Sequence, residues 1–193
     1  MRLFYAVFVP KPVQQALAEA QKRLVGRWKP VLPAQMHVTL LFLGEVHPKA
    51  LERLVHVGRD LGRSVPAFTA VVRGTGYFPN EGKPRVWFAK AEGEGFEPLA
   101  EGLKARLSDL IEEDRPFKAH ITLARRKGPA PRVGPVVFNL EFPVRDFALV
   151  HSELRREGPV YTVLERFALK EREENGKPGQ RAEESLGKRP EAD

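Results

Sequence analysis

The stretches His37-Val38-Thr39-Leu40 and His120-Ile121-Thr122-Leu123 carry the same pattern of histidine, branched apolar residue, threonine and leucine. Both are short and rich in residues that favour β-strands. Side chains two positions apart on a strand point to the same face of a sheet. Each stretch therefore predicts a strand with one apolar face for a core and one histidine–threonine face for a cleft.

Two such faces opposite one another would place two imidazoles and two hydroxyls around one small anion. A single His-x-Thr on a strand is typical of a structural histidine. Two copies with the same flanking residues in similar strand contexts indicate a functional site instead. These two stretches therefore decide both the fold and the candidate site.

The composition fits one domain of ordinary size. The chain has 193 residues, is 42% hydrophobic and carries a formal charge of +7, which favours an anionic partner such as nucleic acid. It has no cysteine, which excludes disulfides, thiolate zinc sites and a cysteine nucleophile and suits a reducing cytoplasm. The apolar run at residues 3–9 is short and ends at a proline, so we expect a first strand rather than a signal peptide or membrane span.

Apolar periodicity and turn residues predict alternating strands and helices with a rough internal duplication. Strands are expected at 3–9, 37–43, 68–72, 85–89, 118–124, 147–152 and 160–169, helices at 12–24, 48–61 and 96–111, and a Gly/Pro-rich loop at 74–84. We expect one domain over residues 1–169, built from two interleaved lobes. Residues 170–193 are almost all charged, glycine or proline, and we expect a disordered tail there.

Paired histidines suit acid–base chemistry because the imidazole pKa lies near neutral pH. In the displacement of a phosphodiester, one imidazole accepts the proton of the attacking oxygen and the other donates a proton to the leaving oxygen. Thr39 and Thr122 could donate hydrogen bonds to the phosphate oxygens. Zinc binding is the competing hypothesis, but a hydrolytic zinc site needs a third ligand, and neither stretch contains a carboxylate.

Three further residues are candidates for substrate binding. Arg125 and Arg126 directly follow the second stretch, and strand alternation places Arg126 on the His120 face unless a bend turns Arg125 inward. Either guanidinium could clamp a phosphate, and either could be a solvated strand-end arginine. Phe42 could stack on a base or could belong to the core.

Several segments beyond the two stretches resemble the two-histidine (2H) phosphoesterases. Within that superfamily the chain resembles the bacterial and archaeal RNA 2′,3′-cyclic phosphodiesterases, also called 2′–5′ RNA ligases. The resemblance covers about residues 2–169 and rests on Arg2-Leu3-Phe4 with Ala6-Val7, the two histidine stretches with Phe42-Leu43-Gly44 and Phe117-Lys118-Ala119, Phe78-Pro79 with Pro84-Arg85-Val86-Trp87, and Ser152-Glu153-Leu154 with Gly158-Pro159-Val160-Tyr161.

The resemblance implies a bilobal α+β fold, with two antiparallel sheets facing each other across a V-shaped groove and helices outside. It implies His37 as the proton donor and His120 as the proton acceptor. It also favours Arg125 over Arg126 as the residue that holds the phosphate, and it gives Phe42 a role in stacking on the terminal base. No metal and no nucleotide cofactor is implied.

We therefore expect a metal-independent, cytoplasmic and monomeric hydrolase that opens RNA 2′,3′-cyclic phosphate ends to 2′-phosphates. Reversible 2′–5′ joining of tRNA halves is a second reaction that the resemblance implies. One alternative is a 2H phosphodiesterase acting on small cyclic nucleotides or 2′–5′ oligonucleotides. Another is a non-catalytic module that binds RNA ends.

Overall fold

The computed structural model describes residues 1–111 and 114–172, and the remaining residues of the expected tail, 173–193, lie outside the described part. Its α-helices are α1 (Lys11–Gln21), α2 (Leu51–Ser64) and α3 (Phe96–Arg106), and its short 3₁₀ turns are η1 (Pro33–Gln35), η2 (Pro48–Ala50) and η3 (Ser108–Leu110). Its strands are β1 (Arg2–Phe8), β2 (Trp28–Pro30), β3 (His37–Glu45), β4 (Phe68–Asn80), β5 (Lys83–Glu92), β6 (His120–Arg126), β7 (Val137–Val144), β8 (Asp146–Arg155) and β9 (Gly158–Ala168).

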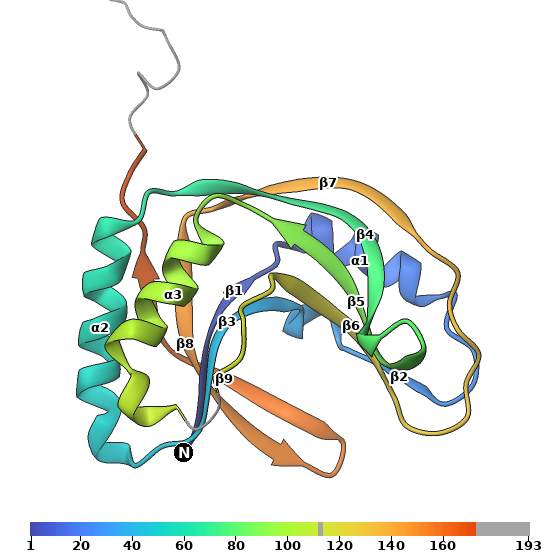
Figure 1. Ribbon diagram of the computed structural model, residues 1–193, viewed down its shortest axis with the longest axis horizontal. Coiled ribbons are helices and arrows are strands. Elements are labelled where there is room, and N and C mark those ends of the chain that lie inside the picture. Colours follow the sequence, from blue (N-terminus) through green and yellow to red (C-terminus); the bar gives the residue numbers. More distant parts are fainter. Residues whose placement is uncertain (112–113, 173–193) are drawn as a thin grey trace, which may run out of the picture.

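The strands form one antiparallel path in the order β7-β4-β5-β6-β3-β1-β8-β9, and β2 pairs with β6. At the centre of this path, β3 and β6 are joined by a single residue pair, Val38 with Ile121. The two expected sheets are therefore two halves of a continuous, arched sheet (Figure 1). We call β3, β1, β8 and β9 the His37 half, and β7, β4, β5, β6 and β2 the His120 half.

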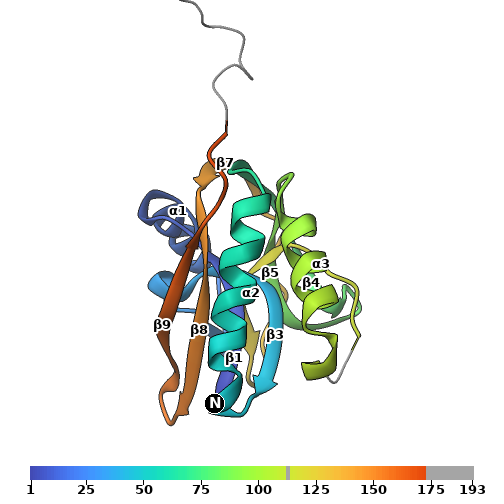
Figure 2. The same cartoon turned by 90° about the vertical axis from the view of Figure 1, so that its left-hand side faces the viewer.

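Helices α1 and α3 cross between the halves. Helix α1 follows β1 of the His37 half but packs against β6 and β7, whereas α3 follows β5 of the His120 half but packs against β3. Helices α2 and α3 run side by side over the outer side of the His37 half (Figures 1 and 2). This exchange ties the halves together despite the single residue pair between their sheets. The internal duplication itself stays a prediction.

The buried core lies between the helices and the sheet. The largest fully buried side chains come from strands of both halves and from the helices, among them Trp87, Tyr5, Phe96 and Phe147. Both signature strands contribute their branched apolar residues and leucines to this core, as the alternation predicts. None of the helices in the described part of the chain is long and apolar enough to cross a membrane.

The expected loop at 74–84 is wrong, because β4 and β5 continue through most of it as a hairpin that turns after Asn80. Gly82 lies in the turn of this hairpin, whereas Gly76 serves close packing within the strand: a Cβ on Gly76 would lie 2.9 Å from the ring of Phe88. The expectation also missed β7 and the three-residue β2. The third expected helix is shorter than predicted, since α3 ends at Arg106 and a 3₁₀ turn follows.

The folded part extends beyond the boundary expected after Leu169. The backbone of Lys170 accepts a hydrogen bond from the Ala67 nitrogen (2.8 Å) and donates one to the Val65 carbonyl (2.9 Å). Arg172 forms an ion pair with Glu94 at 3.0 Å. The start of the expected tail is therefore attached to the loop that connects α2 to β4 and to the α3 side of the sheet.

Candidate active site

The two signature strands bring the two histidines to the centre of the sheet. The pairing of Val38 with Ile121 aligns the strands in opposite directions, and both histidine–threonine faces line one cavity of about 1160 Å³. The side chains of His37, Thr39, His120 and Thr122 all line this cavity. The four residues that the sequence pattern singled out therefore share one site, although the two stretches are far apart in the chain.

His37 is held in a defined orientation by the residues around it. Its Nδ1 lies 2.7 Å from the Gln35 carbonyl oxygen, and its Nε2 lies 3.0 Å from the hydroxyl of Thr39. Because a carbonyl only accepts hydrogen bonds, we assign the Nδ1–H tautomer to the neutral ring. The rings of Phe4 and Tyr161 lie 5.1 and 5.6 Å from the imidazole. Nε2 is then the atom that exchanges a proton in the cavity.

His120 repeats this arrangement on the other half. Its Nδ1 lies 2.7 Å from the carbonyl oxygen of Lys118, again two residues earlier in the chain. The rings of Phe78 and Phe88 lie 4.7 and 5.3 Å away. Among the described residues, none forms a hydrogen bond with Nε2 of His120. Both imidazoles therefore present Nε2 to the cavity from a ring fixed through Nδ1.

The surroundings lower the pKa of both imidazoles. Burial lowers the pKa of His37 to about 4; the bond to Gln35 opposes this effect, and the positive charges of His120 and Arg125 add to it. Burial also lowers the pKa of His120, with further contributions from the charges of Arg125 and Lys118. Both rings are therefore mostly neutral at pH 7 in the free protein, and an anion in the cavity would raise both pKa values.

Arg125, and not Arg126, points to the cavity. In the β5–β6 ladder Trp87 pairs with Ala124 and Phe88 with Thr122, so Leu123 is an extra residue that forms a bulge. The bulge reverses the alternation, and Arg125 lines the same cavity as Thr122. The placement of Arg126 by simple alternation is therefore wrong. Its guanidinium instead donates to the carbonyl oxygen of Ala130 at 2.7 Å.

Phe42 lines the cavity for a similar reason. On β3, Thr39 pairs with Ala6 and Leu41 with Tyr5, so Leu40 is an extra residue and Phe42 returns to the Thr39 face. The ring is 48% exposed, which argues against a core role. The guanidinium of Arg2 lies 4.8 Å from its centre. Phe42 therefore offers an accessible aromatic face at one end of the cavity.

The lining of the cavity is strongly basic. Among the described residues, the lining includes six lysine or arginine residues and no aspartate or glutamate: Arg2, Arg85, Arg115, Lys118, Arg125 and Lys127. A cavity with this charge attracts anions and suits phosphate groups in particular. Within residues 1–111 and 114–172, no three His, Cys, Asp or Glu side chains come together as a group that could hold a metal ion. Zinc binding, the competing hypothesis from the sequence, therefore has no third ligand there.

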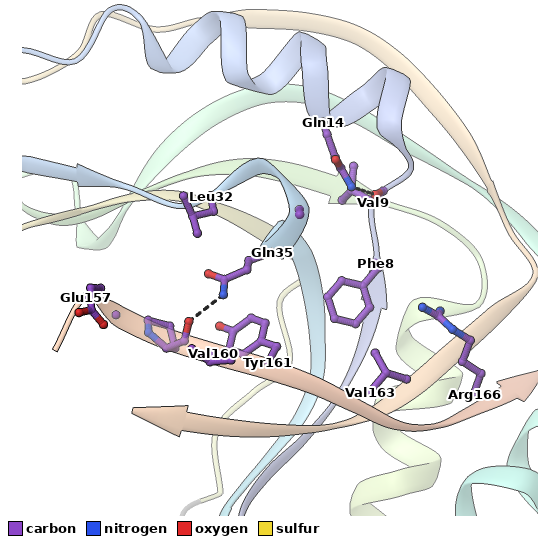
Figure 3. A pocket seen from close by; sticks show the side chains of 13 residues that line it. Phe8, Val9, Gln14, Leu32, Gln35, Glu157, Val160, Tyr161, Val163 and Arg166 are labelled. Carbon is purple, nitrogen blue, oxygen red and sulfur yellow. Dashed lines mark hydrogen bonds between the residues drawn. The ribbon is translucent and has the colours of Figure 1, made fainter. Parts of the chain in front are cut away.

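The sequence pattern assigned no site role to three aromatic residues whose rings contact His37, namely Phe4, Phe8 and Tyr161. Phe8 lies 5.8 Å from the imidazole and Tyr161 5.6 Å. Both also line a neighbouring cavity of about 570 Å³ between β9, the end of β1 and the loop around η1 (Figure 3). The strand alternation of β1 was the available signal for Phe8, since it places Phe4, Ala6 and Phe8 on one face.

Known proteins are similar to this chain in sequence and in overall structure. The sequence model of the LigT-like phosphoesterases matches residues 7–88. A Thermus thermophilus protein named RNA 2′,3′-cyclic phosphodiesterase is 56% identical over 203 aligned positions that cover all of both chains. The crystal structure of the TT0787 protein of Thermus thermophilus has a TM-score of 0.85 and 58% identity, and covers 90% of this chain and 100% of that one.

A further crystal structure, of Escherichia coli LigT complexed with 3′-AMP, has a TM-score of 0.75 and 28% identity. It covers 87% of this chain and 97% of that one. The resemblance inferred from the sequence is thus confirmed over the whole length of the chain. On this identity and coverage, the chain belongs to the LigT-like phosphoesterase family of the two-histidine superfamily.

Proposed function

We propose that this protein hydrolyses RNA 2′,3′-cyclic phosphate ends to 2′-phosphates by two-histidine acid–base catalysis. The observation that carries the proposal is the repeated geometry of His37 and His120 in one basic cavity, each fixed through Nδ1 and free to exchange a proton at Nε2. The substrate class comes from the 56% identical relative, which is named RNA 2′,3′-cyclic phosphodiesterase.

In the proposed reaction, water attacks the phosphorus while Nε2 of His120 accepts its proton. The bond from phosphorus to the 3′ oxygen breaks, and Nε2 of His37 donates a proton to that oxygen. The product carries a 3′ hydroxyl and a 2′-phosphate. The hydroxyls of Thr39 and Thr122 and the guanidinium of Arg125 line the same cavity and would hold the phosphate oxygens as negative charge develops.

Because the pKa of His37 is lowered in the free protein, the proposed mechanism depends on the negative charge of the bound substrate. In the free protein, a histidine with a pKa of about 4 is almost entirely unprotonated at pH 7 and has no proton to donate from Nε2. A bound phosphodiester brings a negative charge next to His37, which raises its pKa and favours the protonated ring. Substrate binding would therefore favour the protonated form of His37, the proton donor. The charges of Arg125 and Lys118 oppose protonation of His120, which suits the role of proton acceptor.

The reverse direction uses the same groups. If a 5′ hydroxyl of a second RNA replaces water, His120 accepts its proton and the product is a 2′–5′ phosphodiester. Joining of tRNA halves would be one instance of this reaction. We expect a monomer acting in the cytoplasm, with which the absence of cysteine from the sequence agrees.

The test is hydrolysis of a short RNA that ends in a 2′,3′-cyclic phosphate, in excess EDTA. The wild type should give a 2′-phosphate end, and His37→Ala and His120→Ala should each lower kcat by at least about a hundredfold. His56→Ala is the matched control, because His56 is exposed on α2 and lines neither cavity near the site.

The outcomes separate the alternatives. Binding of the RNA without turnover at any pH would indicate a module that only binds RNA ends. Turnover that is lost in EDTA and restored by a divalent metal would refute the two-histidine mechanism. Faster turnover of 2′–5′ oligonucleotides than of cyclic phosphate ends would indicate a different substrate class and would be compatible with the same two-histidine mechanism.

A further inference from the structure

A second basic cavity opens where β5 begins and β6 ends. It has a volume of about 570 Å³ and lies between residues 82–85 and residues 126–129. Of the residues that the structure describes, four cationic side chains line it, namely Lys83, Arg85, Arg126 and Lys127, and no aspartate or glutamate does. We call it the Lys83 cavity.

The positive charge of the Lys83 cavity is not neutralised within the described part of the chain. None of its four cationic residues forms an ion pair with a described residue. Arg126 donates to the carbonyl oxygens of Ala130 and Pro84, which satisfies hydrogen bonds but leaves the charge uncompensated. The neighbouring acid, Glu81, is already paired with Arg132 at 3.0 Å. Four cations around an open cavity of this kind favour a polyanion.

The Lys83 cavity adjoins the active cavity. Arg85 and Lys127 line both of them. Lys127 follows Thr122 by five positions along β6 and its end, so the two lie at most about 17 Å apart at ~3.3 Å per strand residue, and the bulge at Leu123 shortens this distance. A stacked nucleic-acid strand rises ~3.4 Å per nucleotide, so this distance corresponds to about five nucleotides, or fewer if the strand is extended.

The cavity beside His37 is less suited to a phosphate chain. Its side chains are mostly apolar, including Phe8, Leu32, Val160 and Val163 (Figure 3). Its one basic residue, Arg166, lies 3.8 Å from the carboxylate of Asp146. The charge distribution therefore directs a polyanion from the active cavity toward Lys83.

We propose that the Lys83 cavity is a subsite for the sugar–phosphate backbone of an RNA strand whose 2′,3′-cyclic end lies at the two histidines. This inference rests on the proposed function and extends it: the enzyme distinguishes RNA from mononucleotides by backbone contacts several nucleotides upstream of the reacting phosphate. Lys83 is a binding residue for long substrates and takes no part in the chemistry.

The test compares Lys83→Glu and Lys83→Gln with the wild type on a series of substrates that carry a 2′,3′-cyclic phosphate, from a mononucleotide to an RNA of about eight nucleotides. Lys83 lies outside the active cavity and is exposed near the hairpin turn, so the variants should fold and should keep kcat/KM for the mononucleotide. For the longest RNA, Lys83→Glu should lower kcat/KM by roughly three- to tenfold through KM. Loss of one phosphate contact should also reduce the slope of log KM against log salt by about 0.7.

Lys49→Glu is the matched control, because it makes the same charge change at an exposed residue that lines neither the active cavity nor the Lys83 cavity. Equal losses of kcat/KM for the longest RNA in Lys49→Glu and Lys83→Glu would overturn the subsite, because they would show a general effect of net charge. A wild type with the same kcat/KM on all lengths would also overturn it, while leaving the proposed function intact. A wild type that hydrolyses no substrate in the series would instead refute the proposed function.

Discussion

The lowered pKa of His37 predicts that the protein loses stability in mild acid, and that His37→Gln removes much of this loss. The imidazole has a pKa of about 4 in the folded protein against 6.5 in the unfolded chain. Between these values the unfolded chain binds a proton that the folded protein does not bind. The free energy of unfolding therefore falls as the pH drops below 6.5.

The magnitude follows from the size of the shift. Each pKa unit corresponds to about 1.4 kcal/mol, so His37 can account for at most ~3 kcal/mol, of which ~2.5 kcal/mol is lost between pH 7.5 and pH 4.5. Solvent screening reduces this figure, because the ring is partly accessible. His120 contributes in the same direction, since its pKa is also lowered.

The assay is urea unfolding of the wild type and His37→Gln at several pH values from 8.5 to 4.5. The difference in unfolding free energy between the two proteins should be constant above pH 7.5, where neither state binds the proton, and this range is the internal control. Below pH 6.5 the unfolding free energy of His37→Gln should fall less than that of the wild type. Parallel curves down to pH 4.5 would refute the burial of a neutral imidazole at this position.

Three further predictions concern other parts of the chain. Arg125→Ala should lower turnover by tenfold or more at unchanged stability. Arg126→Ala should lower the unfolding free energy by about 1 kcal/mol with little effect on mononucleotide turnover. Kinetics and urea unfolding measure both effects, and the opposite pattern would contradict the bulge at Leu123. Truncation after Arg172 should leave the melting temperature unchanged, but truncation after Leu169 should lower it by several degrees, because it removes two backbone bonds and an ion pair. Gly62→Ala should cost about 1–3 kcal/mol in urea unfolding, because its Cβ would lie 2.6 Å from a backbone carbonyl oxygen of β9, and an unchanged midpoint would show that α2 can move away.

Local sequence patterns were sufficient where the structure depends on side-chain alternation. The two histidine–threonine faces and the buried leucines of these strands follow from a period of two residues, whereas their shared cavity requires the pairing of β3 with β6. The same rule would also have found β7, where Phe138, Leu140, Phe142 and Val144 alternate with more exposed residues, had it been applied there. The loop expected at 74–84 was wrong because Gly76 lies inside β4, where it accommodates the Phe88 ring, and only the region of Gly82 is a turn.

The four histidine and threonine residues that line the candidate site could be predicted from the sequence alone, because the same short pattern on two strands specifies which side chains share a face. The sequence did not determine which arginine joins them. That choice depends on the bulge at Leu123, which exists only where β6 pairs with β5, and the bulge at Leu40 likewise depends on β1. The lowered pKa values and the Lys83 cavity were also decided by the tertiary structure, since burial and the summed charge of residues distant in the chain arise only when the strands are assembled.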